Sequence, residues 1–173
     1  MMRFPLHTLH VLNIFALFVT CTWCIAGTIQ DDPLGFDGIK WGRSLEHHPR
    51  LVQVDRSEDI VFYGLKDTAV LAWGIPVESI KFLAVKNQFA QALIHYQGED
   101  THQTLMEYLE TTFGEHQLSP GSMMRGLNQH YSWRGHTTEI SLTYHGLTER
   151  GFISVQSRVL AAALMNAVSD QKF

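Results

Sequence analysis

Histidines are the residues of this chain with the clearest capacity for chemistry, since they number 10 among its 173 residues. Imidazole is the commonest metal ligand in proteins, and the run Glu-His-His at 46–48 places three candidate ligands in a row. Neighbours on a helical turn point about 100° apart, so we do not expect this run to close on one ion. If a metal site forms, it is best predicted at His130, His136 and His145, because adjacent strands can bring these positions together.

The patterns of a catalytic site are weak. The carboxylate pairs at 58–59 and 99–100 stand at the expected ends of elements, where acids interact favourably with a helix N-terminus or stay hydrated. Ser122 lacks the second glycine and the preceding apolar strand of a nucleophile elbow. The chain contains neither G-x-G-x-x-G nor a Walker lysine. We therefore expect a protein that is not an enzyme and that binds no cofactor.

The first 26 residues have the pattern of a bacterial secretory signal peptide. Arg3 precedes an apolar stretch, and Cys24 and Ala26 supply small residues three and one positions before the expected cleavage site. We expect cleavage after Ala26 and a periplasmic or secreted location. Retention of the segment as an anchor is an alternative, because its 17 residues from Val11 are just long enough to cross about 30 Å of hydrocarbon. Lipidation of a cysteine is another alternative.

The remainder of the chain is expected to form a linker at 27–34 and a single domain at 35–170. Both cysteines, Cys21 and Cys24, lie in the signal, so the mature chain has no disulfide and no thiolate. The formal charge of −4, without a Lys/Arg cluster, argues against nucleic acid as a partner. We expect no stable membrane span after cleavage.

Strand patterns dominate the expected domain. Residues 35–42 predict a short opening strand, and β-branched and aromatic residues predict more strands downstream. Two of these strands flank a short polar loop at 86–88, which is typical of a hairpin. Clean alternation of apolar and polar residues predicts a half-buried antiparallel strand at 139–145. The other predicted strands lie at 51–54, 60–63, 79–85, 89–96, 131–134 and 151–156.

Ser44 is expected to cap one helical turn at 45–48, and two longer helices are predicted between and after the strands. The spacing of Leu105, Leu109 and Phe113 indicates a helix that begins near Asp100 and ends at Gly114. Ser157 is expected to cap a last helix. The fold class is therefore α+β, an antiparallel sheet with helices on one face. A duplication of an α-β-β-β unit, offset by roughly 60 to 70 residues, is an alternative organisation.

Aromatic residues near strand ends and one long loop are the candidate contact residues. Trp41, Trp73 and Trp133 either seal the core, the interpretation that we favour, or form a contact surface. The longest expected loop, 115–128, contains Met123 and Met124 beside Arg125, and exposed methionines adapt to irregular surfaces.

The segment Gly35-Phe36-Asp37-Gly38-Ile39-Lys40-Trp41-Gly42 resembles the G-F-x-G-I-x-W-G opening of small, uncharacterised bacterial secreted proteins. This resemblance implies export and an α+β domain, and it implies no activity or catalytic residue. The predicted repeat is more distantly similar to the α-β-β-β modules of β-lactamase inhibitor proteins, which are binding modules. We therefore expect an exported, non-enzymatic module that binds a protein or envelope component. The alternative is a histidine-dependent metal-binding or pH-responsive periplasmic protein.

Overall fold

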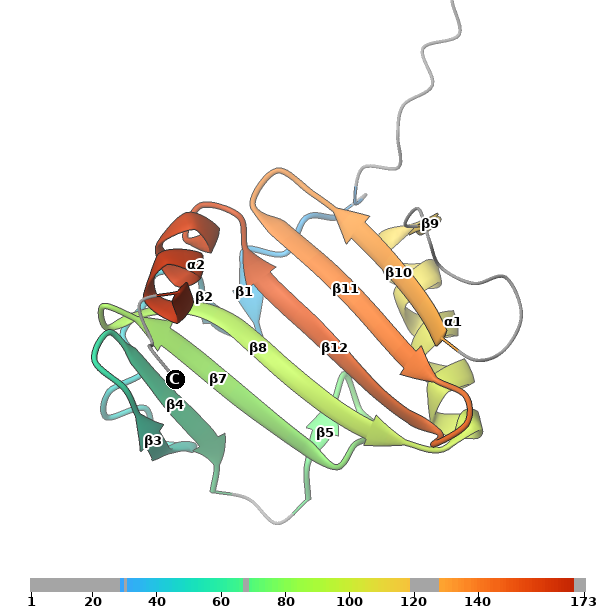
Figure 1. Ribbon diagram of the computed structural model, residues 1–173, viewed down its shortest axis with the longest axis horizontal. Helices are drawn as coiled ribbons and strands as arrows, with labels where there is room; N and C mark the ends of the chain where they lie inside the picture. Colours follow the sequence, from blue (N-terminus) through green and yellow to red (C-terminus); the bar gives the residue numbers. More distant parts are fainter. Residues whose placement is uncertain (1–28, 30, 67–68, 119–127, 170–173) are drawn as a thin grey trace, which may run out of the picture.

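The computed structural model describes residues 29, 31–66, 69–118 and 128–169, and these form an α+β fold built on one large sheet (Figure 1). The sheet has eight strands, and every neighbouring pair is antiparallel. In spatial order the strands are β3 (Leu51–Arg56), β4 (Ile60–Leu65), β7 (Ser79–Val85), β8 (Gln88–Gln97), β12 (Arg150–Ser157), β11 (Thr138–His145), β10 (Asn128–Arg134) and β9 (Gln117–Leu118). The expected antiparallel sheet is confirmed.

Two meanders joined by a helix make up the sheet. Strands β3, β4, β7 and β8 form the first, and strands β9 to β12 form the second. Helix α1 (Glu99–Phe113) carries the chain from β8 to the far edge, so that β12 returns beside β8 in the middle of the sheet (Figure 1). Within the described residues, neither helix is long and apolar enough to cross a bilayer.

The larger core lies between the sheet and α1. Alternate residues of each strand face this side, as the two-residue period of a strand requires; on β7 these are Ile80, Phe82 and Ala84. Helix α1 contributes the predicted stripe Leu105, Leu109 and Phe113, which is buried against them. We call this side of the sheet the α1 face.

Two very short hairpins cover the part of the α1 face that the helix leaves free. Strands β1 (Gly35–Phe36) and β2 (Ile39–Lys40) form one, and strands β5 (Leu71–Ala72) and β6 (Ile75–Pro76) form the other. The expected single strand at 35–42 is therefore wrong. Asp37 and Gly38 adopt φ values of 51° and 78°, the left-handed pair of a tight hairpin turn, which folds the segment back on itself.

Helix α2 (Ala161–Ser169) lies on the opposite side of the sheet, which we call the α2 face. Its Leu164 and Ala167 pack with Leu83 and Val85, the β7 residues that alternate with those of the larger core. The prediction that the helices share one face is thus wrong, because β12 delivers the chain to the other side. Ser157 does cap the turn before α2, accepting the Leu160 N–H through its hydroxyl oxygen at 3.3 Å.

Candidate functional site

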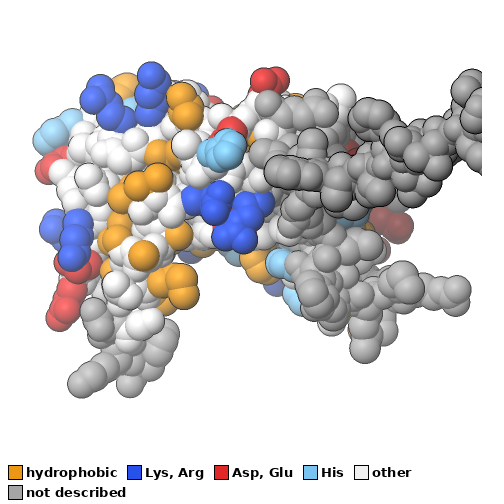
Figure 2. Space-filling view, turned by 90° about the horizontal axis from the view of Figure 1, so that it is seen from above, with side chains coloured by type: hydrophobic (Ala, Val, Ile, Leu, Met, Phe, Trp, Pro, Cys, Tyr) orange, Lys and Arg blue, Asp and Glu red, His pale blue; other side chains and the backbone are white. Residues whose placement is uncertain are grey.

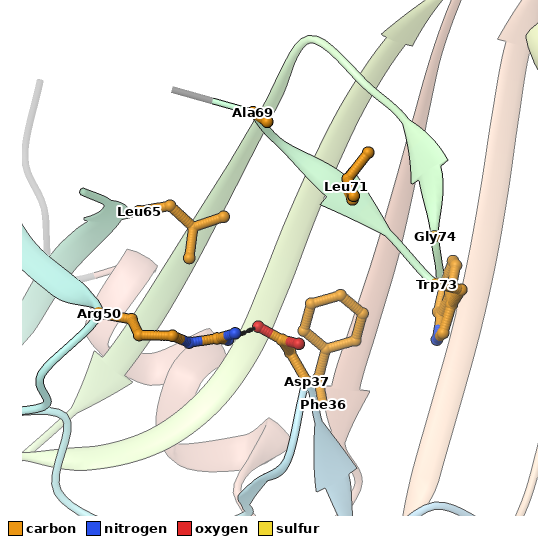
Figure 3. A pocket seen from close by; sticks show the side chains of 8 residues that line it. All are labelled: Phe36, Asp37, Arg50, Leu65, Ala69, Leu71, Trp73 and Gly74. Carbon is orange, nitrogen blue, oxygen red and sulfur yellow. Dashed lines mark hydrogen bonds and ion pairs between the residues drawn. The ribbon is translucent and has the colours of Figure 1, made fainter. Parts of the chain in front are cut away.

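A hollow of about 350 Å³ opens on the α1 face between the two short hairpins and the chain around Arg50 (Figure 3). Its volume falls in the range of small-molecule sites, about 300–1,000 Å³. We call it the Arg50 hollow, and its lining residues are Phe36, Asp37, Arg50, Leu65, Ala69, Leu71, Trp73 and Gly74. They come from the two short hairpins, from the chain before β3 and from the end of β4, so the hollow exists only in the folded chain.

Trp73 forms one wall of this hollow in an unusual backbone conformation. Its φ of 53° is left-handed, a region that bulky residues rarely adopt, and Gly74 follows at 84°. The ring is held on two sides. It stacks on Tyr108 of α1 at 5.3 Å between ring centroids, and it meets Phe36 edge to face at 5.4 Å. These contacts fix the indole and connect the β5–β6 hairpin to both α1 and the β1–β2 hairpin.

An ion pair between Arg50 and Asp37 provides the charge of the Arg50 hollow. Both side chains remain partly exposed, and Figure 3 shows them meeting between Leu65 and Phe36. Among the described residues that line the hollow, these two are the charged ones. The hollow therefore combines one guanidinium, one carboxylate and apolar walls.

A second, more apolar hollow of about 410 Å³ surrounds Trp41 at the end of the molecule where α2 lies. The Trp41 Nε1–H donates to Thr138 Oγ1 at 2.8 Å, and the ring packs on Phe89 at 4.7 Å, so the indole is fixed while one side stays accessible. Leu34 is 60% exposed and Val159 is 77% exposed beside it. Figure 2 views this end and shows hydrophobic side chains forming a band between Lys and Arg side chains. We call Leu34, Trp41, Val159 and Leu160 the Trp41 surface.

Three histidines lie on the α2 face, beyond the part that α2 covers. His130 pairs across with Thr143, and His145 pairs with Asn128, so the two imidazoles are diagonal neighbours. His95 lies in the cross-strand row that continues through Phe152 and Thr143 to His130. His130 Nδ1 lies 2.9 Å from Thr143 Oγ1, and His145 Nδ1 lies 2.6 Å from Asn128 Oδ1.

The predicted trio of metal ligands is not assembled. His136 lies in the turn at the other end of the β10–β11 hairpin, six residues from His130, or about 20 Å at the rise of a strand. Its inclusion is therefore wrong, since the hairpin register separates it from the other two histidines. The described residues contain no group of three or more side chains arranged to hold a metal ion.

A closed polar network lies beneath α1, on strands β8, β12, β11 and β10. Gly151 stands between Tyr96 and Tyr144 across three strands, and Gln129 continues the same row on β10. His102 of α1 rests on this row, with its ring stacked on Tyr144 at 4.0 Å. It is 5% exposed, and Tyr96 is 1% exposed.

Hydrogen bonds satisfy both nitrogens of His102. Nδ1 lies 2.8 Å from the Tyr96 hydroxyl, and Nε2 lies 3.0 Å from Gln129 Oε1, which also accepts from Tyr131. Since Oε1 can only accept, Nε2–H must donate to it, and Nδ1 then accepts from the hydroxyl of Tyr96. Burial lowers the pKa of His102, against the opposing effects of the Gln129 bond and Glu99. The network thus holds a neutral imidazole whose bonding capacity is used within the protein.

The predicted contact residues differ in where they lie and in how deeply they are buried. Trp41 and Trp73 are half-buried and line the two hollows. Trp133 is 1% exposed, and its Nε1–H donates to the Gly114 carbonyl, so the favoured interpretation that it seals the core is confirmed and its alternative assignment as a contact residue is wrong. It closes the core at the C-terminal end of α1. Met123, Met124 and Arg125 lie outside the described residues, as does the predicted signal peptide.

Sequence reasoning missed the Arg50–Asp37 pair and the His102 network. The Asp-Gly dipeptide at 37–38 was a usable signal, because it is a favoured hairpin turn. Nothing local pairs Asp37 with Arg50, which lies 13 residues away. His102 could be placed on the buried stripe of α1, being three residues before Leu105, but its partners come from the other strands.

Comparisons of the chain with protein-family models, curated proteins and solved structures found no match. The resemblance to small secreted proteins stays a prediction.

Proposed function

We propose that this protein is an exported, non-enzymatic module of the bacterial cell envelope that binds a protein partner through the Trp41 surface. The observation that carries the proposal is an indole fixed by its own hydrogen bond beside two strongly exposed aliphatic side chains, Leu34 and Val159. Exposed apolar side chains gathered around a hollow are typical of interaction sites rather than of a solvated surface.

The chemistry of this surface favours a partner that inserts an apolar side chain. Trp41 and Leu160 supply partly buried apolar walls, and the exposed Lys40 and Gln88 supply polar groups at the rim. Buried aromatic anchors with a polar rim are the usual composition of the centre of a protein interface. The ordered indole also lowers the entropic cost of binding, because its position is set before the partner arrives.

Site-specific photo-crosslinking in the exporting cell tests this proposal. A photoreactive residue at position 159 should give a reproducible crosslinked product, whereas one at position 147 should give none. Leu147 is the matched control, since it is an 82% exposed aliphatic residue in the turn between β11 and β12. Val159→Lys should abolish capture by a probe placed at Leu34. Equal products from both positions, or no product from 159, would overturn the proposal.

A histidine-dependent function is the second candidate, supported by the neighbouring positions of His130 and His145 on the α2 face, where His95 also lies, in the same row as His130 with two strands between them. Protonated imidazoles would make this face attractive to an anionic partner at acid pH. Titration with zinc and copper, and binding measured across pH 6, test this candidate. No metal binding tighter than about 10 μM and no pH-dependent association would contradict it. His130→Gln should weaken any such binding, and His136→Gln is the control.

We also infer that the two meanders arose from one unit. The α-β-β-β form of that unit holds only for the second meander, because the helical turn expected at 45–48 is not formed and no helix precedes β3 in the described residues. The support is their arrangement, with β8 and β12 adjacent in the middle and β3 and β9 at the two edges. Relatives whose halves are more alike in sequence would strengthen this inference. Relatives whose halves resemble two different families would contradict it.

A further inference from the structure

The Arg50–Asp37 pair has unused bonding capacity. A guanidinium carries five N–H donors, and one nitrogen of Arg50, Nη2, contacts one oxygen of Asp37, Oδ2. Among the described residues, no hydrogen bond reaches the other oxygen of Asp37. The pair therefore holds two opposite charges at the hollow, each able to receive a further partner.

The apolar walls of the Arg50 hollow lie close to this pair. Phe36 is buried, Leu65 and Trp73 are half-buried, and Leu71 is 48% exposed although it is aliphatic. Figure 3 shows Leu71 and Leu65 on the two sides of the space in front of the pair. A ligand with a short apolar body and a charged end would cover Leu71 and replace the water around it.

The turn that carries Trp73 is a further sign of a built site. Positive φ at the first central position of a tight hairpin turn is normally given to Asn, Asp or Gly. Here a tryptophan occupies that position, and its indole packs against the edge of the larger core and also forms a wall of the hollow. Backbone strain of this kind concentrates at ligand-binding segments.

We propose that the Arg50 hollow binds a free α-amino acid with an apolar side chain. Its carboxylate binds Arg50, its ammonium group binds Asp37, and its side chain lies against Leu71 and Trp73. Among the described residues of the lining there is one positive and one negative side chain, which matches a zwitterion whose ammonium and carboxylate groups are attached to the same carbon atom. The hollow lies on the α1 face of the first meander, so this site is separate from the Trp41 surface.

Calorimetric titration of the purified protein with L-phenylalanine and two blocked derivatives tests the proposal. Phenylalanine should bind with a Kd below about 1 mM, as expected for a ligand of this size. N-acetyl-phenylalanine lacks the ammonium group and phenylalaninamide lacks the carboxylate, so both should bind at least about tenfold more weakly. The proposal would be overturned if either derivative bound as tightly as phenylalanine. It would also be overturned if phenylalanine showed no binding at about 10 mM, ten times the expected upper limit of its Kd.

Two variants assign the charges to the two residues. Arg50→Gln should weaken phenylalanine binding about tenfold and remove the preference over phenylalaninamide. Asp37→Asn should remove the preference over N-acetyl-phenylalanine in the same way. Both residues are partly exposed, so both variants should fold, which circular dichroism checks.

Further variants separate this site from a general charge effect. Arg56→Gln is the matched control, because Arg56 is an exposed arginine at the other end of β3 and does not line the hollow. It should bind phenylalanine like the unmodified protein. Leu71→Ser should weaken phenylalanine binding while leaving glycine unaffected. A similar loss in Arg56→Gln and Arg50→Gln would overturn the assignment.

Discussion

The His102 network and the Arg50–Asp37 pair both lie on the α1 face, and they differ in how completely the protein satisfies their hydrogen-bonding groups. The His102 network is buried, and each ring nitrogen has a partner from the protein. The Arg50–Asp37 pair is partly exposed at the mouth of a hollow and retains donors and an acceptor. A buried, fully bonded network stabilises and specifies a core, whereas an accessible pair with spare capacity is suited to a ligand. Polar side chains on one face thus serve different purposes according to how deeply they are buried.

The largest loss of stability is expected from a substitution at Gly151, where the buried network is most tightly packed. A Cβ atom at Gly151 would lie 2.0 Å from Cζ of Tyr96, which is fully buried. Gly151→Ala should therefore push the Tyr96 ring off its place and lower the free energy of unfolding by about 3 kcal/mol. Urea unfolding measures this loss. Gly64→Ala is the control within the same sheet, because its Cβ would meet only the exposed Val54 side chain at 3.2 Å; it should cost less than half as much.

Replacing His102 by a residue without ring nitrogens should cause the next largest loss of stability. His102→Phe keeps an aromatic ring against Tyr144 but leaves the Tyr96 hydroxyl and Gln129 without their partner. An unsatisfied buried group costs about 1–3 kcal/mol, which urea unfolding at pH 8 would measure. His95→Phe, on the exposed α2 face, should change stability by about 0.5 kcal/mol or less. If His102→Phe left the free energy of unfolding unchanged, the network would contribute nothing to stability.

Protonation of His102 should make the stability of the protein depend on pH, which distinguishes the buried network from the exposed ion pair. Because burial lowers the pKa of His102, the unfolded chain binds this proton more readily than the folded protein does. The stabilisation is fully present above the ordinary histidine pKa of about 6.5 and is lost as the pH falls from there towards the folded value. Thermal unfolding between pH 8 and pH 5 should show this decline. The decline should be smaller in His102→Phe, and an identical decline would assign it to other groups.

The smallest effect on stability is expected at the Arg50–Asp37 pair. Partly exposed ion pairs contribute about 0–1 kcal/mol, because water screens both charges. Arg50→Gln and Asp37→Asn should each change the free energy of unfolding by no more than this. A loss above 2 kcal/mol in either variant would mean that the pair is structural, and the contrast with the His102 network would fail.

Much of the sheet was predictable because its information is local. Alternation along 139–145 and the polar loop at 86–88 identified strands and a hairpin that the structure contains. The stripe Leu105, Leu109 and Phe113 identified α1 for the same reason, since periodicity shows directly which face is buried. The two short hairpins were not predicted, because strands of two residues are too short to show an alternation of apolar and polar side chains. In addition, tryptophan, which occupies position 73, is not a residue that predicts a left-handed turn.

By itself, the sequence determined the antiparallel α+β character, the place of α1 and most strands of this protein, because side-chain alternation and helical spacing act over a few neighbouring residues. Tertiary structure alone decided the face that α2 covers, the separation of His136 from His130, and the burial of Trp133. It also decided which polar residues keep hydrogen-bond donors or acceptors that other residues of the protein do not use. Those outcomes depend on strand order and on contacts between distant segments, which no local pattern encodes.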